Sequence, residues 1–186
     1  FGSTIKDLGV INVNIAGASR TAGLVGHNKF SSVSNCYITG SIIGVEFVGG
    51  LVGMVDDSST VNNCYSTSDV NGSGNVVGGL AGKIISSSVS NCYSTGSVTG
   101  TNFVGGIIGS STGGYAVSGL FWNIDDFSTD NGIGTGITTT EMQTVNTFID
   151  GDWDFEIEAA NGTNDYWDID NISGVYNSGY PFLSWE

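Results

Sequence analysis

Basic residues are scarce in this sequence, which has four Lys and Arg against 18 Asp and Glu in 186 residues and a formal net charge of −14. Proteins that bind the phosphate backbone of nucleic acids need clustered Lys and Arg to displace counterions. We therefore expect no nucleic-acid partner. Long apolar runs are missing as well, since none approaches the about 20 residues that a membrane-spanning helix requires. We expect no membrane span in this chain.

Proline, histidine and charged residues of either sign are also few. The chain has one Pro and one His, and Asp, Glu, Lys and Arg together make up 12% of it, about half of their usual share. Glycine, with 30 residues, has roughly twice its average share. This is not the composition of an ordinary α/β enzyme. His27 has no matching Ser, Cys or Asp for a catalytic triad or a zinc site, so we expect no enzyme and assign no catalytic residue.

The charges that are present are unevenly distributed along the chain. All four basic residues lie within the first 83 positions, whereas 13 of the 18 acids lie between Asp125 and Glu186. The tryptophans occur only from residue 122 onward. Such asymmetry predicts two parts. We place a repeat region at residues 1–122 and an acidic, Trp-rich module at residues 123–186.

An internal repeat organises the first part. The triplet Asn-Cys-Tyr occurs at 35–37, 63–65 and 91–93, with a spacing of 28 residues both times. Between the triplets lie short β-branched clusters bounded by Gly, Ser and Asn, which indicate strands. Three short strands per repeat cannot close a core alone, but stacked repeats bury a continuous interior. The sequence therefore predicts an all-β fold, a right-handed parallel β-helix of about 28-residue coils with a C-terminal capping module.

A second motif recurs once in each full coil. It reads Gly-Leu-Val-Gly at 23–26 and 50–53, and the same motif occurs as Gly-Leu-Ala-Gly at 79–82 and as Gly-Ile-Ile-Gly at 106–109. No helical pattern follows it, so we interpret the glycines as strand corners rather than as a phosphate-binding loop. Together with Val-Ser-Asn-Cys-Tyr-Ser-Thr-Gly-Ser-Val at 89–98, this motif resembles the GLUG repeat of bacterial and archaeal surface proteins.

The resemblance covers residues 5 to about 122, and the GLUG repeat also occurs in some immunoglobulin A proteases and large adhesins. The segments at 121–123, 134–142, 153–155 and 180–185 are similar to the region that often ends such arrays. The resemblance implies a secreted or surface-displayed solenoid used for structure and adhesion, with no activity of its own.

The 28-residue period predicts a column of stacked cysteines. Leu8 and Leu120 fill the same slot in the flanking coils, so the slot requires a compact apolar side chain that points inward. We expect the cysteines to be reduced, buried and stacked, because a buried free Cys behaves as a small hydrophobe. Metal ligation is disfavoured because no paired ligand lies nearby in sequence. The column consists of Cys36, Cys64 and Cys92.

Two further columns flank the cysteines. The tyrosines Tyr37, Tyr65 and Tyr93 fall on the opposite face of the strand by alternation. We favour a structural aromatic stack, while exposed aromatic rings that grip a sugar remain the alternative. The asparagines are expected at a corner, because Asn tolerates the left-handed turn conformation. They are Asn35, Asn63 and Asn91.

The acidic tail offers a calcium candidate. Asp150, Asp152 and Asp154 stand at every second position, and carboxylate oxygens are the ligands that Ca²⁺ prefers. The competing interpretation is a strand in which Trp153 and Phe155 face inward and the acids face water. Asp126, Ser128 and Asp130 form a similar partial loop. We otherwise expect no cofactor.

Three sequons are possible N-glycosylation sites, at Asn71, Asn161 and Asn171.

Open solenoid ends are unpaired sheet edges that need a cover. We expect the tail to cap one end, and we expect the N-terminal end to meet the rest of a longer surface protein or another copy head to tail, which continues into filaments. The start at Phe1 is expected of a processed chain or of a segment of a longer one. The leading hypothesis is a non-enzymatic, extracellular structural or adhesive module at the cell surface, with glycans or matrix proteins as ligands. The alternative is a β-helix protein that binds carbohydrate or degrades polysaccharide.

Overall fold

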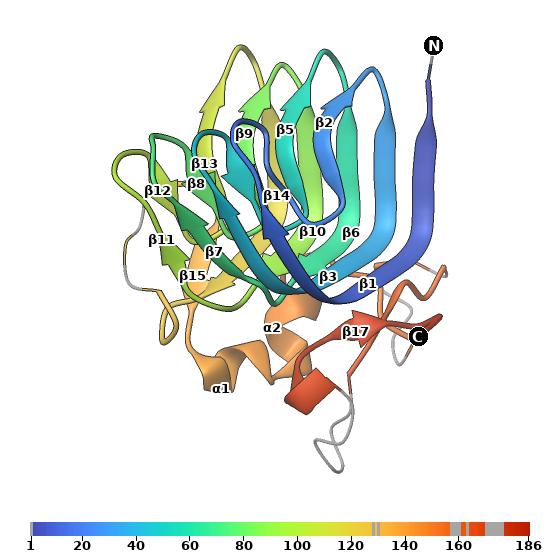
Figure 1. Cartoon of the computed structure of the whole chain (residues 1–186). Helices are drawn as coiled ribbons and strands as arrows, with labels where there is room; N and C mark the ends of the chain where they lie inside the picture. The colour runs from blue at the N-terminus through green and yellow to red at the C-terminus, as the bar shows by residue number, and fades with distance from the viewer. Residues whose placement is uncertain (1, 128, 130, 157–160, 163, 170–176) are drawn as a thin grey trace.

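The computed structural model describes residues 2–127, 129, 131–156, 161–162, 164–169 and 177–186. Its strands stack in parallel as a β-solenoid of about four turns with a spacing of about 28 residues, and 53% of the residues lie in strands. Figure 1 shows the coils side by side, from β1 at one end of the stack to β14 and β15 at the other. The all-β solenoid predicted from the repeat is thus confirmed. Among the described residues, no helix is long and apolar enough to cross a membrane.

The Asn-Cys-Tyr triplets lie in the largest sheet of the solenoid. Val33, Val61 and Val89 align in register, as do the three cysteines and the three tyrosines. Two short strands, β7 (Asp69–Gly72) and β11 (Val98–Thr99), continue this sheet from the second half of β3. The stacked strands are β1 (Thr4–Ala16), β3 (Ser32–Gly44), β6 (Thr60–Ser66), β10 (Ser88–Ser94), β14 (Ala116–Asn123) and β15 (Thr135–Ile137).

Two smaller parallel sheets complete each coil. One contains β4 (Val48–Gly49), β8 (Val77–Gly78) and β12 (Val104–Gly105). The other contains β2 (Val25–Lys29), β5 (Val52–Asp56), β9 (Ala81–Ile85) and β13 (Ile108–Thr112). The strands are short and β-branched, as parallel strands buried on the inner face require.

The Gly-Leu-Val-Gly motif is explained by how closely the backbone packs in each coil. The Leu or Ile of the motif points into the fully buried core, as at Leu51, Leu80 and Ile107. A Cβ placed on Gly53 would lie 2.6 Å from the carbonyl oxygen of Gly26 and 2.7 Å from the carbonyl carbon of Arg20. The final glycine is therefore needed for steric reasons, because only a residue without a side chain lets these backbones approach.

The C-terminal part forms a second core. Its helices are α1 (Thr139–Met142) and α2 (Val145–Ile149), followed by strand β16 (Trp167–Asp168), a short 3-10 turn η1 (Asn177–Gly179) and strand β17 (Phe182–Leu183). Strands β16 and β17 pair antiparallel. Met142, Phe148, Trp153 and Trp167 are fully buried in this core.

The C-terminal part does more than cover the end of the solenoid. The segment up to β15 does cover the last coil: β15 pairs with Phe121–Asn123 of β14, and the Asn131 side-chain amide donates to the carbonyls of Ile108 (2.6 Å) and Gly109 (3.0 Å). The remainder lies along one flank of the stack (Figure 1). It does so because the exposed aromatic face of the large sheet, rather than the end of the solenoid, offers its core an apolar partner.

Candidate functional site

The tyrosine column is an aromatic stack on the outer face of the large sheet. Ring centroids are 4.9 Å apart for both Tyr37–Tyr65 and Tyr65–Tyr93, with interplanar angles of 4° and 5°. Phe121 follows in the next coil. Parallel in-register strands place equivalent rings at the strand spacing, so the stack follows directly from the repeat.

The C-terminal module covers most of this stack. Trp167 packs against both Tyr65 and Tyr93, with centroids 6.2 and 6.0 Å away. The Tyr93 hydroxyl donates to the Pro181 carbonyl at 2.7 Å and accepts from the Asn177 side chain at 2.8 Å. Tyr93 is fully buried, so this ring is not available to grip a sugar.

Tyr65 makes a similar contact at the edge of the module. Its hydroxyl donates to the two carboxylate oxygens of Glu186, at 3.1 Å each. Burial, reinforced by the neighbouring Tyr93, raises the pKa of Tyr65 well above its usual value. Burial also raises the pKa of the Glu186 carboxyl, against the opposing effect of the hydrogen bonds from Leu183 and Tyr65.

The cysteine column lies inside the solenoid. Cys36, Cys64 and Cys92 are free thiols with no exposed surface. Each Sγ donates to the carbonyl two residues earlier, at 3.0 to 3.1 Å. Burial raises the pKa of the Cys64 thiol well above its ordinary value. A thiol whose pKa is raised in this way is a poorer nucleophile, because the thiolate is the reactive form.

The two leucines that flank this column differ in how exposed they are to solvent. Leu120 is 4% exposed, whereas Leu8, which was expected to point into the interior, is 41% exposed. Leu8 pairs with Cys36 in register, but the strand that carries it is the outermost of the stack.

The asparagines of the column have a left-handed backbone and lie within β3, β6 and β10. Asn35, Asn63 and Asn91 have positive φ values of 51°, 49° and 49°, and Asp7 and Gly119 in the flanking coils have 52° and 55°. This left-handed conformation is least costly for Asn, Asp and Gly. The Asn35 amide also donates to Asp7 Oδ1 at 2.9 Å.

The acids proposed for calcium do not converge in the structure. Asp150 and Asp152 are exposed, whereas Asp154 is 6% exposed. The strand expected there is absent, because α2 ends at Ile149 and a turn follows, so Asp154 does not face water. Within the described ranges, no group of three or more His, Cys, Asp or Glu side chains is arranged to hold a metal.

Other parts of the calcium prediction concern the partial loop after Asn123. The Asp126 carboxylate accepts from the Asn123 side chain at 2.7 Å, and Ser128 and Asp130 lie outside the described residues. Calcium binding by the tail stays a prediction.

The sequons lie in different settings. Asn71 is exposed in β7, while the Asn161 side chain donates to the carbonyls of Ile149 (2.7 Å) and Trp153 (3.2 Å). A glycan on Asn161 would compete with these two bonds. Asn171 lies outside the described residues.

His27 lies in β2, and its Nε2 is 3.5 Å from Asp56 Oδ2. The adjacent pair joins Lys29 Nζ to Asp57 Oδ2 at 2.8 Å. Both pairs connect the first coil to the second, since β2 pairs with β5. The Lys29–Asp57 contact is a partly exposed ion pair, and such pairs contribute little stability individually.

A hydroxyl-lined corner precedes strands β1, β3, β6 and β10 of the large sheet. The amides of Ser3, Ser31 and Ser59 donate to the hydroxyls of Ser31, Ser59 and Ser87 respectively, at 3.3, 3.2 and 3.1 Å. The Ser31, Ser59 and Ser87 hydroxyls are therefore used to join successive coils. Sequence analysis did not identify this corner, although the 28-residue spacing of these serines is visible in the sequence.

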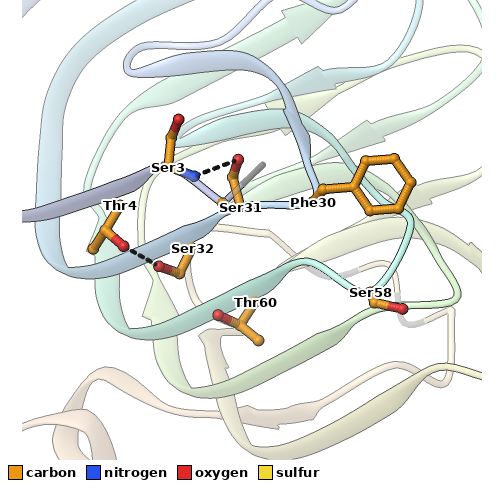
Figure 2. Close-up of a pocket in the computed structure, with 8 residues that line it drawn as sticks. Ser3, Thr4, Phe30, Ser31, Ser32, Ser58 and Thr60 are labelled. Carbon is orange, nitrogen blue, oxygen red and sulfur yellow. Dashed lines mark hydrogen bonds between the residues drawn. The ribbon is translucent and has the colours of Figure 1, made fainter.

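Two shallow hollows lie along this corner. The first, of about 290 Å³, is lined mainly by Ser and Thr beside Phe30, as Figure 2 shows. The second, of about 270 Å³, repeats the arrangement one coil further on, around Ser58, Ser86 and Ser88. Phe30 is 55% exposed, and Ser58 and Thr60, which line the same hollow, are exposed as well.

Comparisons with known proteins agree with this fold. A family model described as "The GLUG motif" matches residues 17–43 and 73–99. No curated protein matches the sequence. The crystal structure of a "putative immunoglobulin A1 protease" from Bacteroides ovatus is similar over 100% of this chain and 71% of that chain, with a TM-score of 0.69 and 17% sequence identity. At that identity the likeness concerns the fold.

Proposed function

We propose that this GLUG-repeat β-solenoid is a non-enzymatic structural and adhesive module of an extracellular, cell-surface protein. The observation that carries the proposal is the use made of the repeated side chains. Cysteines fill the interior, serines join the coils, and tyrosines hold the C-terminal module against the flank. Repeated residues used in this way make a rigid segment, as expected for a solenoid that spaces or displays other parts of a surface protein.

The hydroxyl-lined corner is the surface that favours an adhesive role with a glycan ligand. Sugars are bound by hydrogen bonds to their hydroxyls and by packing of their C–H faces on aromatic rings. The corner offers both kinds of group, because Ser58 and Thr60 line the same hollow as the exposed Phe30. Its lining has no charged residue, which favours neutral glycans over acidic ones on this strongly acidic protein.

An array of neutral glycans, acidic glycans and matrix proteins tests the adhesive role. We expect binding to neutral oligosaccharides, with Phe30→Ala and Thr60→Val each reducing affinity by roughly tenfold, the effect of losing about 1.4 kcal/mol. Thr99→Val is the matched control, since it removes an exposed strand hydroxyl from β11. If the folded protein bound no glycan and no matrix protein, the adhesive role would be contradicted and only the structural role would stand.

Polysaccharide degradation is the second candidate, and Asp56 and Asp57 are the observation that favours it. They adjoin Ser58 of the hydroxyl-lined corner, and glycoside hydrolysis uses paired carboxylates. Turnover of a polysaccharide that is abolished by Asp56→Asn or Asp57→Asn would establish this activity and contradict the non-enzymatic role. Asp69→Asn, in β7, is the control.

A further inference from the structure

A further hollow lies beside strands β12 and β13, at the other end of the solenoid from β1 (Figure 1). It has a volume of about 290 Å³. Its lining comes from the corner before β12, from β13 and the segment after it, and from the segment that covers the last coil. The lining includes Phe103, Ser110, Ser111, Tyr115, Asn131 and Ile133.

Two aromatic side chains of this hollow are exposed. Phe103 is 66% exposed and Tyr115 is 43% exposed. A single exposed apolar residue is ordinary, whereas exposed apolar residues that gather at one place mark a binding surface. Aromatic rings pack against the C–H faces of sugars, and the Tyr115 hydroxyl also offers a hydrogen bond.

The backbone of Phe103 is left-handed, with a φ of 48°. Bulky residues rarely adopt this conformation, and those that do are concentrated at functional sites. The stack holds the corner in place, because the Val77 amide donates to the Phe103 carbonyl at 3.1 Å. Phe47 has a similar φ of 53°, but the Lys83 ammonium lies over its ring, 5.5 Å from the centroid. Phe103 differs from Phe47 in that its side chain is exposed beside a hollow.

Some polar groups of the hollow are held in place, and others are free to bind. The Asn131 side-chain amide donates to two carbonyls of β13, at 2.6 and 3.0 Å, and its Oδ1 accepts from the Ile133 amide at 3.2 Å. The Ser110 and Ser111 hydroxyls have no hydrogen-bond partner in the described part of the chain. Two hydroxyls on a pre-formed surface are therefore available to a ligand.

The chemistry of the lining selects the class of ligand. No charged residue is among the described residues that line the hollow, and the chain carries a net charge of −14, so anionic ligands are disfavoured. An apolar partner would bury the two serine hydroxyls without a hydrogen bond, which costs free energy. A neutral sugar has C–H faces for the rings and hydroxyls for the serines.

We propose that this hollow is a second site for neutral sugars, separate from the hydroxyl-lined corner. Phe103 and Tyr115 would pack against a sugar ring, and Ser110 and Ser111 would bond to its hydroxyls. Phe30 lies between β2 and β3, whereas Phe103 lies between β11 and β12, so one molecule would have a glycan site at each of two different corners. The second site rests on the proposed function, since it takes the same class of ligand.

Nuclear magnetic resonance of the isotope-labelled native chain tests the site directly. The neutral probes are maltohexaose, cellohexaose, laminarihexaose and mannohexaose, and hexagalacturonate is the anionic comparison. We expect at least one neutral probe to shift the amide resonances of Ser110 and Ser111, and hexagalacturonate to shift neither. If no neutral probe moved them at about 10 mM, where a site with a Kd of about 1 mM is largely filled, the second site would be contradicted. Equal shifts with hexagalacturonate would contradict the neutral class of ligand.

Substitutions of corner phenylalanines assign the ligand to the hollow. Phe103→Ala should weaken the binding detected at Ser110 and Ser111 by roughly tenfold, because the exposed ring is lost. Phe103→Tyr should bind as the native chain does, since it keeps the ring. Phe47→Ala is the matched control, because it removes the ring of another left-handed residue that does not line this hollow. If Phe47→Ala weakened binding equally, or if Phe103→Ala left it unchanged, the ligand would not occupy this hollow.

The same titrations distinguish the second site from the hydroxyl-lined corner. Phe30→Ala should leave the shifts at Ser110 and Ser111 unchanged, because Phe30 lies at a different corner. Shifts confined to Ser58 and Thr60, abolished by Phe30→Ala, would support the adhesive role of the hydroxyl-lined corner and overturn the second site. Shifts confined to Ser110 and Ser111 would support the second site and contradict the role of Phe30.

Discussion

Tyr65 and Tyr93 stack with their ring centroids 4.9 Å apart and their planes 5° from parallel. The separation is close to the spacing of neighbouring strands. One set of rings therefore serves two contacts: their faces join successive coils, and their edges and hydroxyls contact the C-terminal module. Damage at this column should weaken both the stack and the docking of the module.

Removing the Tyr93 hydroxyl should loosen the module. Tyr93→Phe takes away the donor to Pro181 and leaves the Asn177 amide with one acceptor fewer, although Asn177 still donates to Pro181 at 2.8 Å. We expect a loss of about 1–3 kcal/mol in the free energy of unfolding, as for a buried polar group deprived of its partner. Denaturant unfolding followed by tryptophan fluorescence measures it, because Trp153 and Trp167 are buried in the module.

Tyr37→Phe is the matched control for this prediction. Tyr37 is only partly buried, and its hydroxyl has no hydrogen-bond partner among the described residues. The centroid of its ring lies 5.9 Å from that of Trp185. The same substitution there should change stability by less than about 0.5 kcal/mol. Equal losses for the two variants would mean that the Tyr93 hydroxyl does not hold the module.

The Glu186 carboxyl should make module docking depend on pH. Burial raises its pKa above the ordinary value of 4.5, so the folded state holds its proton more tightly than the unfolded state. This group therefore reduces stability as pH rises from near 4.5 through the raised pKa. Below that interval, the protonated carboxyl carries no such cost.

Glu186→Gln isolates this effect. The amide oxygen still accepts from Tyr65 and from the Leu183 amide, but it does not titrate. We expect the variant to lose less stability than the native chain between pH 4 and pH 7 when unfolding is followed at both values. If the stabilities of the variant and the native chain changed with pH in parallel, the pH dependence would not come from Glu186. Asp125 and Glu141, whose pKa values are lowered by hydrogen bonds from Thr139 and Thr138, have the opposite dependence and are present in both proteins.

The cysteines should be unreactive in the native state. A thiol reagent is expected to modify none of the three before denaturation and all three afterwards, because they have no exposed surface. Cys64→Asp should cost about 3–5 kcal/mol or prevent folding, since an unpaired carboxylate would be buried in the centre of the column. Cys64→Ala should cost less because it buries no charge, and mass spectrometry that reveals a disulfide would contradict the reduced column.

The repeat made much of the solenoid predictable. A fixed period of 28 sets the register, so the positions of Cys64 and Tyr65 relative to their neighbours followed from spacing alone. Leu8 is more exposed than the column predicted, because among the described residues β1 pairs with β3 and with no strand on its other side. The 28-residue spacing does not show which strand is outermost. The left-handed backbone of Asn63 was predictable from the residue type, whereas its place within β6 was not visible in the sequence.

The C-terminal module was less predictable. Its contacts with the solenoid are single and non-repeating, such as the hydrogen bond between Tyr93 and Pro181, 88 residues apart. Composition indicated an aromatic core but not the face that it covers. Asp154 illustrates the same limit: alternation placed it in water, whereas a turn after α2 buries it and brings its Oδ2 to the Asn164 amide at 3.0 Å.

The glycine that ends the Gly-Leu-Val-Gly motif should be irreplaceable even by alanine. A Cβ on Gly53 would meet backbone atoms of Gly26 and Arg20 at 2.6 and 2.7 Å, and neither is a flexible side chain that can move aside. Gly53 does not have a positive φ, so the expected cost is steric. We expect Gly53→Ala to lose about 3 kcal/mol or more. Gly2→Ala is the control, because its Cβ would meet only the Phe30 carbonyl at 3.7 Å. Thermal unfolding of the two variants decides the matter: a Gly53→Ala protein as stable as Gly2→Ala would show that the motif glycine is not required by close backbone packing.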